Sequence, residues 1–163
     1  MVTTIKRTKE KGQRTPRSMD TYRITGGLEG AAYCECGAVF RNKRWYSEEG
    51  GVMPKGGHGL VCPACRRIAD RNPAGIVSLK GNFLATHATE IENLIKNTVQ
   101  AAGTKHPLGR VMNISKDKGG MTITTTDVKL AQKIGRVVFK SHGGDLHYRW
   151  TDDEDLVRVN WSR

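Results

Sequence analysis

The chain has 163 residues, 37% of them hydrophobic, and its 27 Lys and Arg against 16 Asp and Glu give a formal net charge of +11. It contains no run of about 18 apolar residues, which excludes a transmembrane helix, and its basic N-terminus lacks the apolar segment of a secretory signal. We therefore expect a cytoplasmic protein with one modest core and a polyanionic partner such as nucleic acid, the alternative being a basic charge that serves only solubility.

Residues 1–24 are basic, contain few apolar residues and show no periodicity. Such a segment is expected to be a flexible arm when it is alone in water. Its cations are candidates for pairing with phosphates: Lys6, Arg7, Lys9, Lys11, Arg14 and Arg17. A flexible terminus without a binding role is the alternative.

Residues 25–73 are predicted to form a separate module because they hold all the cysteines. Cys34 and Cys36 form a C-x-C pair, and Cys62 and Cys65 form a C-x-x-C pair. Two tight pairs in a chain without an export signal favour one structural Zn2+ over disulfides, and four thiolates leave no open position for catalysis. His58 is an alternative ligand by residue type, but its glycine neighbours favour a loop tip. Two redox disulfides or unmetallated thiols are the alternatives.

A basic and aromatic run follows the first cysteine pair, and two arginines follow the second. Arginine pairs with phosphate through two hydrogen bonds, and aromatic rings stack on unpaired bases. The candidate nucleic-acid contacts are therefore Arg41, Lys43, Arg44, Trp45, Tyr46, Arg66 and Arg67. The alternative is that the two rings cover the zinc core while the cations are solvated.

Residues 74–163 show clear periodicity and predict the order β-α-β-β-α-β-β. The expected elements are a strand at 74–81, a helix at 82–102, strands at 109–115 and 121–127, a helix at 128–141, and strands at 144–150 and 156–161. Gly103 ends the first helix, Asp127 caps the second, and His87 is expected to be a packed core histidine of the first helix rather than a ligand. The fold class is α+β, with two helices on one face of a mainly antiparallel sheet, preceded by a zinc-ribbon or treble-clef-like module.

The second predicted helix carries a row of cations. Lys129, Lys133, Arg136 and Lys140 are spaced so that all of them fall within about 60° of one another on a helix. No acidic residue lies between 128 and 144, which favours a phosphate-binding stripe over an ordinary solvated face. The acidic run at 152–155 is expected to be a hairpin tip that repels polyanions.

No motif of an enzyme is present. The glycine-rich stretches do not fit a Walker loop, no nucleophile elbow occurs, and no carboxylate pair has an acid–base setting. We therefore expect a protein without catalytic residues and without a small-molecule substrate.

Residues 34–142, including "CECGAVFRNKRWY" and "VCPACRRIADRNPAGIVSLKG", resemble a group of small, largely uncharacterised bacterial zinc proteins. The paired knuckles and "TTTDVKLAQKIG" are more distantly similar to the zinc-ribbon family of the archaeal and eukaryotic large-ribosomal-subunit export adaptor of nonsense-mediated-decay nomenclature, although that family has C-x-x-C-G where this chain has C-x-C-G. The resemblance implies binding to the ribosome or to RNA. The cysteine order is also similar to the redox-switch zinc centre of an oxidation-activated heat-shock chaperone family.

The expected function is therefore that of a non-enzymatic zinc protein that binds RNA on the ribosome, in assembly, rescue or stress-time hibernation. Its expected partners are ribosomal RNA and ribosomal proteins, with no membrane. A redox-sensing zinc switch is the second hypothesis. A DNA-binding regulator is the third, because no helix-turn-helix pattern occurs and exposed aromatic rings suit unpaired bases better than a groove.

Overall fold

The computed structural model describes Tyr22 and residues 30–47, 56–151 and 156–163, and these parts form an α+β structure with two sheets. The smaller sheet and a short helix come first: β1 (Ala32–Tyr33), β2 (Ala38–Arg41), β3 (Arg44–Ser47), β4 (His58–Gly59) and α1 (Pro63–Ala69). The larger sheet and its helices follow: β5 (Gly75–Lys80), α2 (Asn82–Gly103), β6 (Val111–Asp117), β7 (Gly120–Thr125), α3 (Val128–His142), β8 (Asp145–Trp150) and β9 (Val157–Ser162).

The larger sheet has the strand order β6-β7-β5-β9-β8. Its neighbours pair antiparallel except β5 and β9, which run parallel, with Val77 opposite Val159. The strands alternate buried and exposed residues along β8 and β9, as expected for a sheet that is covered on one face only. The sheet is therefore mixed, and the prediction of mainly antiparallel pairing needs that one amendment.

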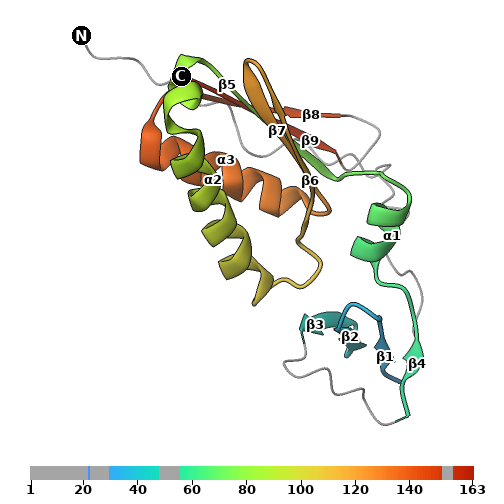
Figure 1. The fold of residues 1–163 in the computed structure, drawn as a ribbon. Helices are drawn as coiled ribbons and strands as arrows, with labels where there is room; N and C mark the ends of the chain where they lie inside the picture. The colour runs from blue at the N-terminus through green and yellow to red at the C-terminus, as the bar shows by residue number, and fades with distance from the viewer. Residues whose placement is uncertain (1–21, 23–29, 48–55, 152–155) are drawn as a thin grey trace.

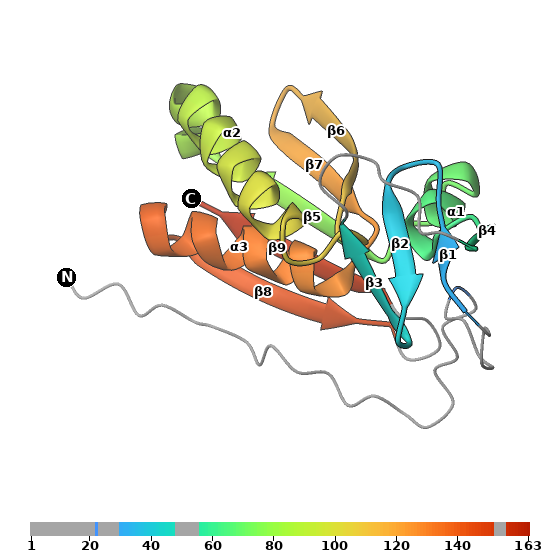
Figure 2. The same cartoon turned by 90° about the horizontal axis from the view of Figure 1, so that it is seen from below.

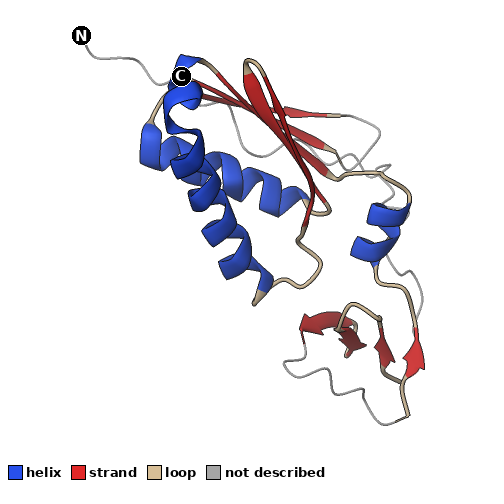
Figure 3. Cartoon of the chain, in the orientation of Figure 1, coloured by secondary structure: helices blue, strands red, loops and turns tan. Residues whose placement is uncertain are grey.

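Helices α2 and α3 cover one face of this sheet (Figures 1 and 3). Trp161, Leu79 and Ile134 are fully buried between the helices and the strands. Burying a side chain of this size stabilises the folded state by about 1.5–3 kcal/mol relative to leaving it exposed. This layer is the main core of the protein, and it holds the connection that follows α2 in place.

The ends of the two helices follow the sequence signals. The Asp127 carboxylate accepts a hydrogen bond from the Leu130 backbone N–H at 3.1 Å, which caps α3 as predicted. Helix α2 ends at Gly103 as predicted and is kinked at His87. The His87 ring stacks on Phe83 with the centroids 3.8 Å apart, but His87 is half-buried and is not the core histidine predicted from the sequence.

The smaller sheet has the order β3-β2-β1-β4, and α1 lies between it and the larger sheet along the chain (Figures 1 and 2). Strand β3 is at the edge of this sheet, with Trp45 opposite Phe40. The Tyr22 hydroxyl donates a hydrogen bond to Asp70 at 2.7 Å, just after α1.

The predicted helices and strands of residues 74–163 are confirmed, with a two-residue shift at β6, which spans Val111–Asp117 rather than 109–115. The six cations of the basic arm and the acidic run at 152–155 lie outside the described residues. Within the described part of the chain, no helix combines the length and the apolar character needed to cross a bilayer.

Candidate metal centre and the basic groove beside it

The first cysteine pair lies in the turn between β1 and β2. The Gly37 backbone N–H donates to the Cys34 carbonyl oxygen at 3.0 Å, and the Cys34 N–H donates to the Ala38 carbonyl at 2.8 Å. Gly37 has a φ of +93°, a left-handed conformation that costs an L-residue with a Cβ atom free energy. The glycine therefore lets a C-x-C pair form a knuckle turn that is one residue shorter than C-x-x-C.

The second pair lies at the start of α1. Cys62 is the N-cap residue, and its Sγ accepts a hydrogen bond from the Cys65 backbone N–H at 3.4 Å. Pro63 follows at the first helical position, where a missing N–H costs nothing. Helix α1 therefore begins within "CPAC", and its start holds both sulfur atoms.

The four sulfur atoms converge, although the two pairs are far apart in the sequence. All four Sγ atoms lie within 4.8 Å of one another. The Sγ atoms of Cys34 and Cys65, and those of Cys36 and Cys62, are each 3.7 Å apart. Sulfurs at about 2.3 Å from a zinc ion lie roughly 3.8 Å apart at the corners of a tetrahedron, whereas a disulfide needs about 2.05 Å. The donor set fits a tetrahedral metal ion, and all four cysteines are free thiols.

A small apolar cluster surrounds the sulfur atoms. Cys34 and Cys62 are buried with Ala38 and Ala64, and Trp45 and Leu108 pack against them. His58 is exposed, and the described residues within reach of the sulfurs include no histidine that completes the set. The donor set therefore consists of four cysteines, the composition of a structural zinc site.

Arg110, in the connection between α2 and β6, contacts the sulfur atoms of the cysteines. Its Nη2 donates to Cys36 Sγ at 2.7 Å, and its Nη1 donates to Cys65 Sγ at 3.4 Å. Its Nε donates to the Pro107 carbonyl at 3.1 Å, which fixes the guanidinium plane. A guanidinium bound to thiolates offsets part of the negative charge that four thiolates and one divalent ion carry. Sequence reasoning did not find Arg110, because only the tertiary structure brings it to the cysteines.

These contacts separate the pKa values of the thiols. Burial acts to raise the pKa of Cys36, but the hydrogen bond from Arg110 and that from the Ala38 backbone outweigh it, and the pKa falls to about 7. Burial raises the pKa of Cys62 and that of Cys65. Burial acts to lower the pKa of Arg110, but its bonds to Cys36 and Cys65 raise that pKa above the ordinary value, so Arg110 stays charged.

Thr126 holds Arg110 in position. Its hydroxyl donates to the Leu108 carbonyl at 2.5 Å and accepts from the Arg110 backbone N–H at 2.9 Å. Its backbone N–H donates to the Arg110 carbonyl at 2.9 Å. Thr126 is buried at the end of β7, and the next residue, Asp127, caps α3. The "TTTD" motif therefore anchors both a helix and the segment that contacts the cysteines.

A groove of about 610 Å3 lies between β3 and the connection after α2, beside the start of α3. We call it the join groove. It is lined by Lys43, Arg44, Trp45, Tyr46, Ser47, Thr104, Lys105, His106, Pro107, Leu108, Gly109, Asp127 and Lys129. Four of the predicted RNA contacts from the first module therefore meet Lys129 from α3 in one place.

The other predicted RNA contacts are elsewhere. Arg41 lies over the Tyr46 ring, 5.0 Å from its centroid. Arg67 is buried, donates to the Asn72 carbonyl at 3.2 Å and lies over Tyr22, so it is a structural contact rather than a surface cation. Arg66 is exposed.

The predicted stripe is uneven. Its end residues, Lys129 and Lys140, are exposed, whereas Lys133 and Arg136 are half-buried. Only Lys129 lines the join groove. The four cations therefore do not present an equally accessible row, although the helix predicted for them is present.

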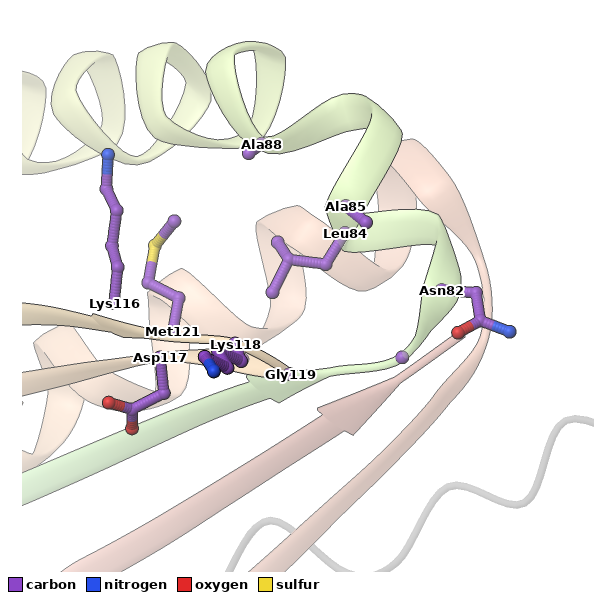
Figure 4. Close-up of a pocket in the computed structure, with 11 residues that line it drawn as sticks. Asn82, Leu84, Ala85, Ala88, Lys116, Asp117, Lys118, Gly119 and Met121 are labelled. Carbon is purple, nitrogen blue, oxygen red and sulfur yellow. The ribbon is translucent and has the colours of Figure 1, made fainter.

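A second hollow of about 220 Å3 lies between the start of α2 and the β6–β7 hairpin (Figure 4). Figure 4 shows Leu84 and Met121 projecting into the space between these elements. Lys116 at its edge forms an ion pair with Glu92 at 2.5 Å, so this cation is already neutralised.

Comparisons with known proteins give no relative on which to base a function: no protein-family model, no curated protein and no solved structure matches the chain.

Proposed function

We propose that the protein is a non-enzymatic, zinc-containing RNA-binding protein that associates with the ribosome. One observation carries the proposal: Arg110 ties the segment after α2 to the sulfur cluster, so that cations of the smaller sheet, of this segment and of α3 converge on the join groove. Lys43 and Arg44 come from the turn and edge strand of the smaller sheet, and Lys105 and Lys129 come from the larger part. The resemblance to the large-subunit adaptor family and the formal net charge of +11 support the same reading.

The zinc ion has a structural role in this proposal. One Zn2+ bound by Cys34, Cys36, Cys62 and Cys65 would supply the folding free energy of a module whose described core is very small. The arrangement of a knuckle turn, a hairpin and a helix that begins at the second cysteine pair is similar to a treble clef. The metal would therefore position β3 and its cations without taking part in a reaction.

The first test is sucrose-gradient sedimentation of a cell lysate, with the protein followed by immunoblotting. Gradients are run at low and high salt, with and without ribonuclease. We expect the protein to sediment with a ribosomal particle at low salt and to be released at high salt, because phosphate contacts weaken as salt rises. A protein that stays at the top of every gradient contradicts ribosome association.

A redox-sensing zinc switch is a second candidate, and the sulfur geometry favours it. The sulfur atoms of Cys34 and Cys65, and those of Cys36 and Cys62, are each 3.7 Å apart, which is close enough for disulfides after small movements. Each pair of thiolates would give two electrons to hydrogen peroxide, which takes up two protons from water and forms two water molecules as the disulfide forms and zinc is released. Zinc retained under mild peroxide rules this candidate out.

A further inference from the structure

We infer that the join groove is the binding site for a short single-stranded segment of RNA, with unpaired bases stacked on its aromatic wall. The inference rests on the proposed function and adds a location and a substrate class to it.

The charge of the groove selects an anionic ligand. Lys43, Arg44, Lys105 and Lys129 line it from four different positions of the chain. Among the lining residues that the structure describes, Asp127 is the only acidic one, and its carboxylate accepts a hydrogen bond from the Leu130 N–H. The remaining positive charge therefore faces solvent and the ligand, and phosphate groups are its natural counterpart.

The aromatic wall selects unpaired bases. Trp45 and Tyr46 are adjacent on β3, so their side chains project to opposite faces of the strand, and both residues are half-buried and line the groove. Trp45 is held by the apolar cluster of the metal centre and by Phe40, whose ring centroid is 5.2 Å away. Tyr46 is held from one side by Arg41. Rings that are fixed before binding lose little conformational entropy when a base stacks on them, and stacking tolerates any base.

The size and the position of the groove agree with a few nucleotides. Its volume of about 610 Å3 falls within the roughly 300–1,000 Å3 range of ligand sites. Figures 1 and 2 both show β3 next to the connection that follows α2, so the groove has an aromatic side and a side that carries Lys105. A duplex keeps its base faces stacked inside the helix and offers only phosphates to such walls, so a single strand uses more of the site.

The test measures binding of fluorescein-labelled RNA to the full, zinc-loaded chain by fluorescence anisotropy. The probes are an eight-nucleotide oligouridylate, an eight-nucleotide oligoadenylate, a duplex RNA of equal charge and, as a competitor, free AMP. We expect both single strands to bind at least about 10-fold more tightly than the duplex, because they use phosphate and stacking contacts together. AMP that competes as well as the octamers would show a mononucleotide site and would overturn the inference.

Three variant pairs locate the site, and each removes two charges. Lys105→Gln with Lys129→Gln changes the groove, Lys133→Gln with Lys140→Gln changes the rest of the α3 stripe, and Lys80→Gln with Lys118→Gln changes exposed lysines at the far end of the sheet. We expect the groove pair to weaken single-strand binding by about 10-fold or more and to reduce the slope of log K against log salt by about 1 to 2. The other two pairs of substitutions should weaken single-strand binding by less than about threefold.

Stacking is tested with Tyr46→Phe and Tyr46→Leu. Phenylalanine keeps the ring and should keep the affinity, whereas leucine removes the ring and should weaken binding severalfold to both octamers. Zinc content is measured on each variant so that a damaged metal centre is not read as a lost contact. Equal affinities for the Phe and Leu variants overturn the stacking role.

The outcomes separate the groove from the general function. One outcome is that the variant with both groove substitutions binds RNA as tightly as the variant with both far-end substitutions while the protein still sediments with ribosomes. In that case RNA does not bind in the join groove, and the proposed function stands. If the stripe pair causes the larger loss, RNA lies along α3 instead and the inference is overturned. If the unaltered protein binds neither RNA nor ribosomes, both proposals fail.

Discussion

The guanidinium of Arg110 lies 2.7 Å from the sulfur of Cys36, although the two residues are 74 positions apart in the chain. This contact joins the segment after α2 to the first knuckle turn. The same segment contributes Leu108 to the apolar cluster around the sulfurs and one wall of the join groove. The metal centre and the groove are therefore built on shared residues, and changes in one are expected to reach the other.

Replacing Arg110 should weaken metal retention. Arg110→Ala removes the hydrogen bonds to Cys36 and Cys65, and loss of such a partner of a metal ligand commonly costs roughly 10–100-fold in metal affinity. Arg110→Lys keeps the charge but cannot donate to Cys36 and Cys65 from two guanidinium nitrogens, so an intermediate loss of metal affinity is expected. The measurement is the rate of zinc transfer to an excess of a colorimetric chelator.

The matched control is Arg149→Ala, which removes an exposed arginine from β8. It should release zinc at the same rate as the unaltered protein. If the Arg110 and Arg149 variants behave alike, Arg110 has no role at the metal.

The chain should bind one zinc ion through cysteine sulfur alone. Cys62→Ser replaces a buried ligand with a poor one, so we expect loss of the stoichiometric metal and unfolding of the small module. His58→Ala should keep a full complement of zinc because His58 is exposed and outside the sulfur cluster. Elemental analysis gives the stoichiometry, and cobalt substitution followed by visible absorption identifies four-sulfur coordination. A spectrum with nitrogen ligation would contradict the all-cysteine assignment.

The Thr126 hydroxyl should stabilise both the fold and the metal centre. Thr126→Val keeps the shape but leaves the Leu108 carbonyl and the Arg110 N–H without this partner, which should lower the free energy of unfolding by about 1–3 kcal/mol. Zinc release should become faster because Arg110 is held less firmly. Thr126→Ser retains the hydroxyl, so its free energy of unfolding should fall much less. Chemical denaturation and the zinc-transfer assay measure the two effects, and a Val variant as stable as the unaltered protein beside a destabilised Ser variant would assign the role to the methyl group instead.

Two glycines of the helices should respond oppositely to alanine. A Cβ atom at Gly135 would lie 2.5 Å from Cγ1 of Val159, a stiff β-branched side chain, so Gly135→Ala should destabilise the fold by about 1–3 kcal/mol. A Cβ atom at Gly103 meets nothing within 4 Å, so Gly103→Ala should leave stability unchanged or raise it by up to about 1 kcal/mol. Denaturant midpoints measure both, and a Gly135 variant as stable as the unaltered protein would show that the helix–sheet contact can relax.

The sequence by itself determined the local structure of this protein. Apolar periodicity placed α2 and α3, and Gly103 and the Asp127 cap marked where one ends and the other begins. The spacing of the cysteines predicted that Cys34 and Cys36 would meet Cys62 and Cys65. The helices, the caps and each cysteine pair are decided by residues a few positions apart, and the meeting of the two pairs was predicted because one metal ion needs four ligands.

Only the tertiary structure decided what lies next to the metal centre. The parallel pairing of β5 with β9, the burial of Arg67 against Tyr22 and the hydrogen bonds of Arg110 each join segments distant in sequence. Nothing near Arg110 in the sequence distinguishes it from the other basic residues of the chain. Its role follows from Thr126 and from the packing of Leu108, because long-range contacts depend on how the two sheets fit together rather than on local propensity.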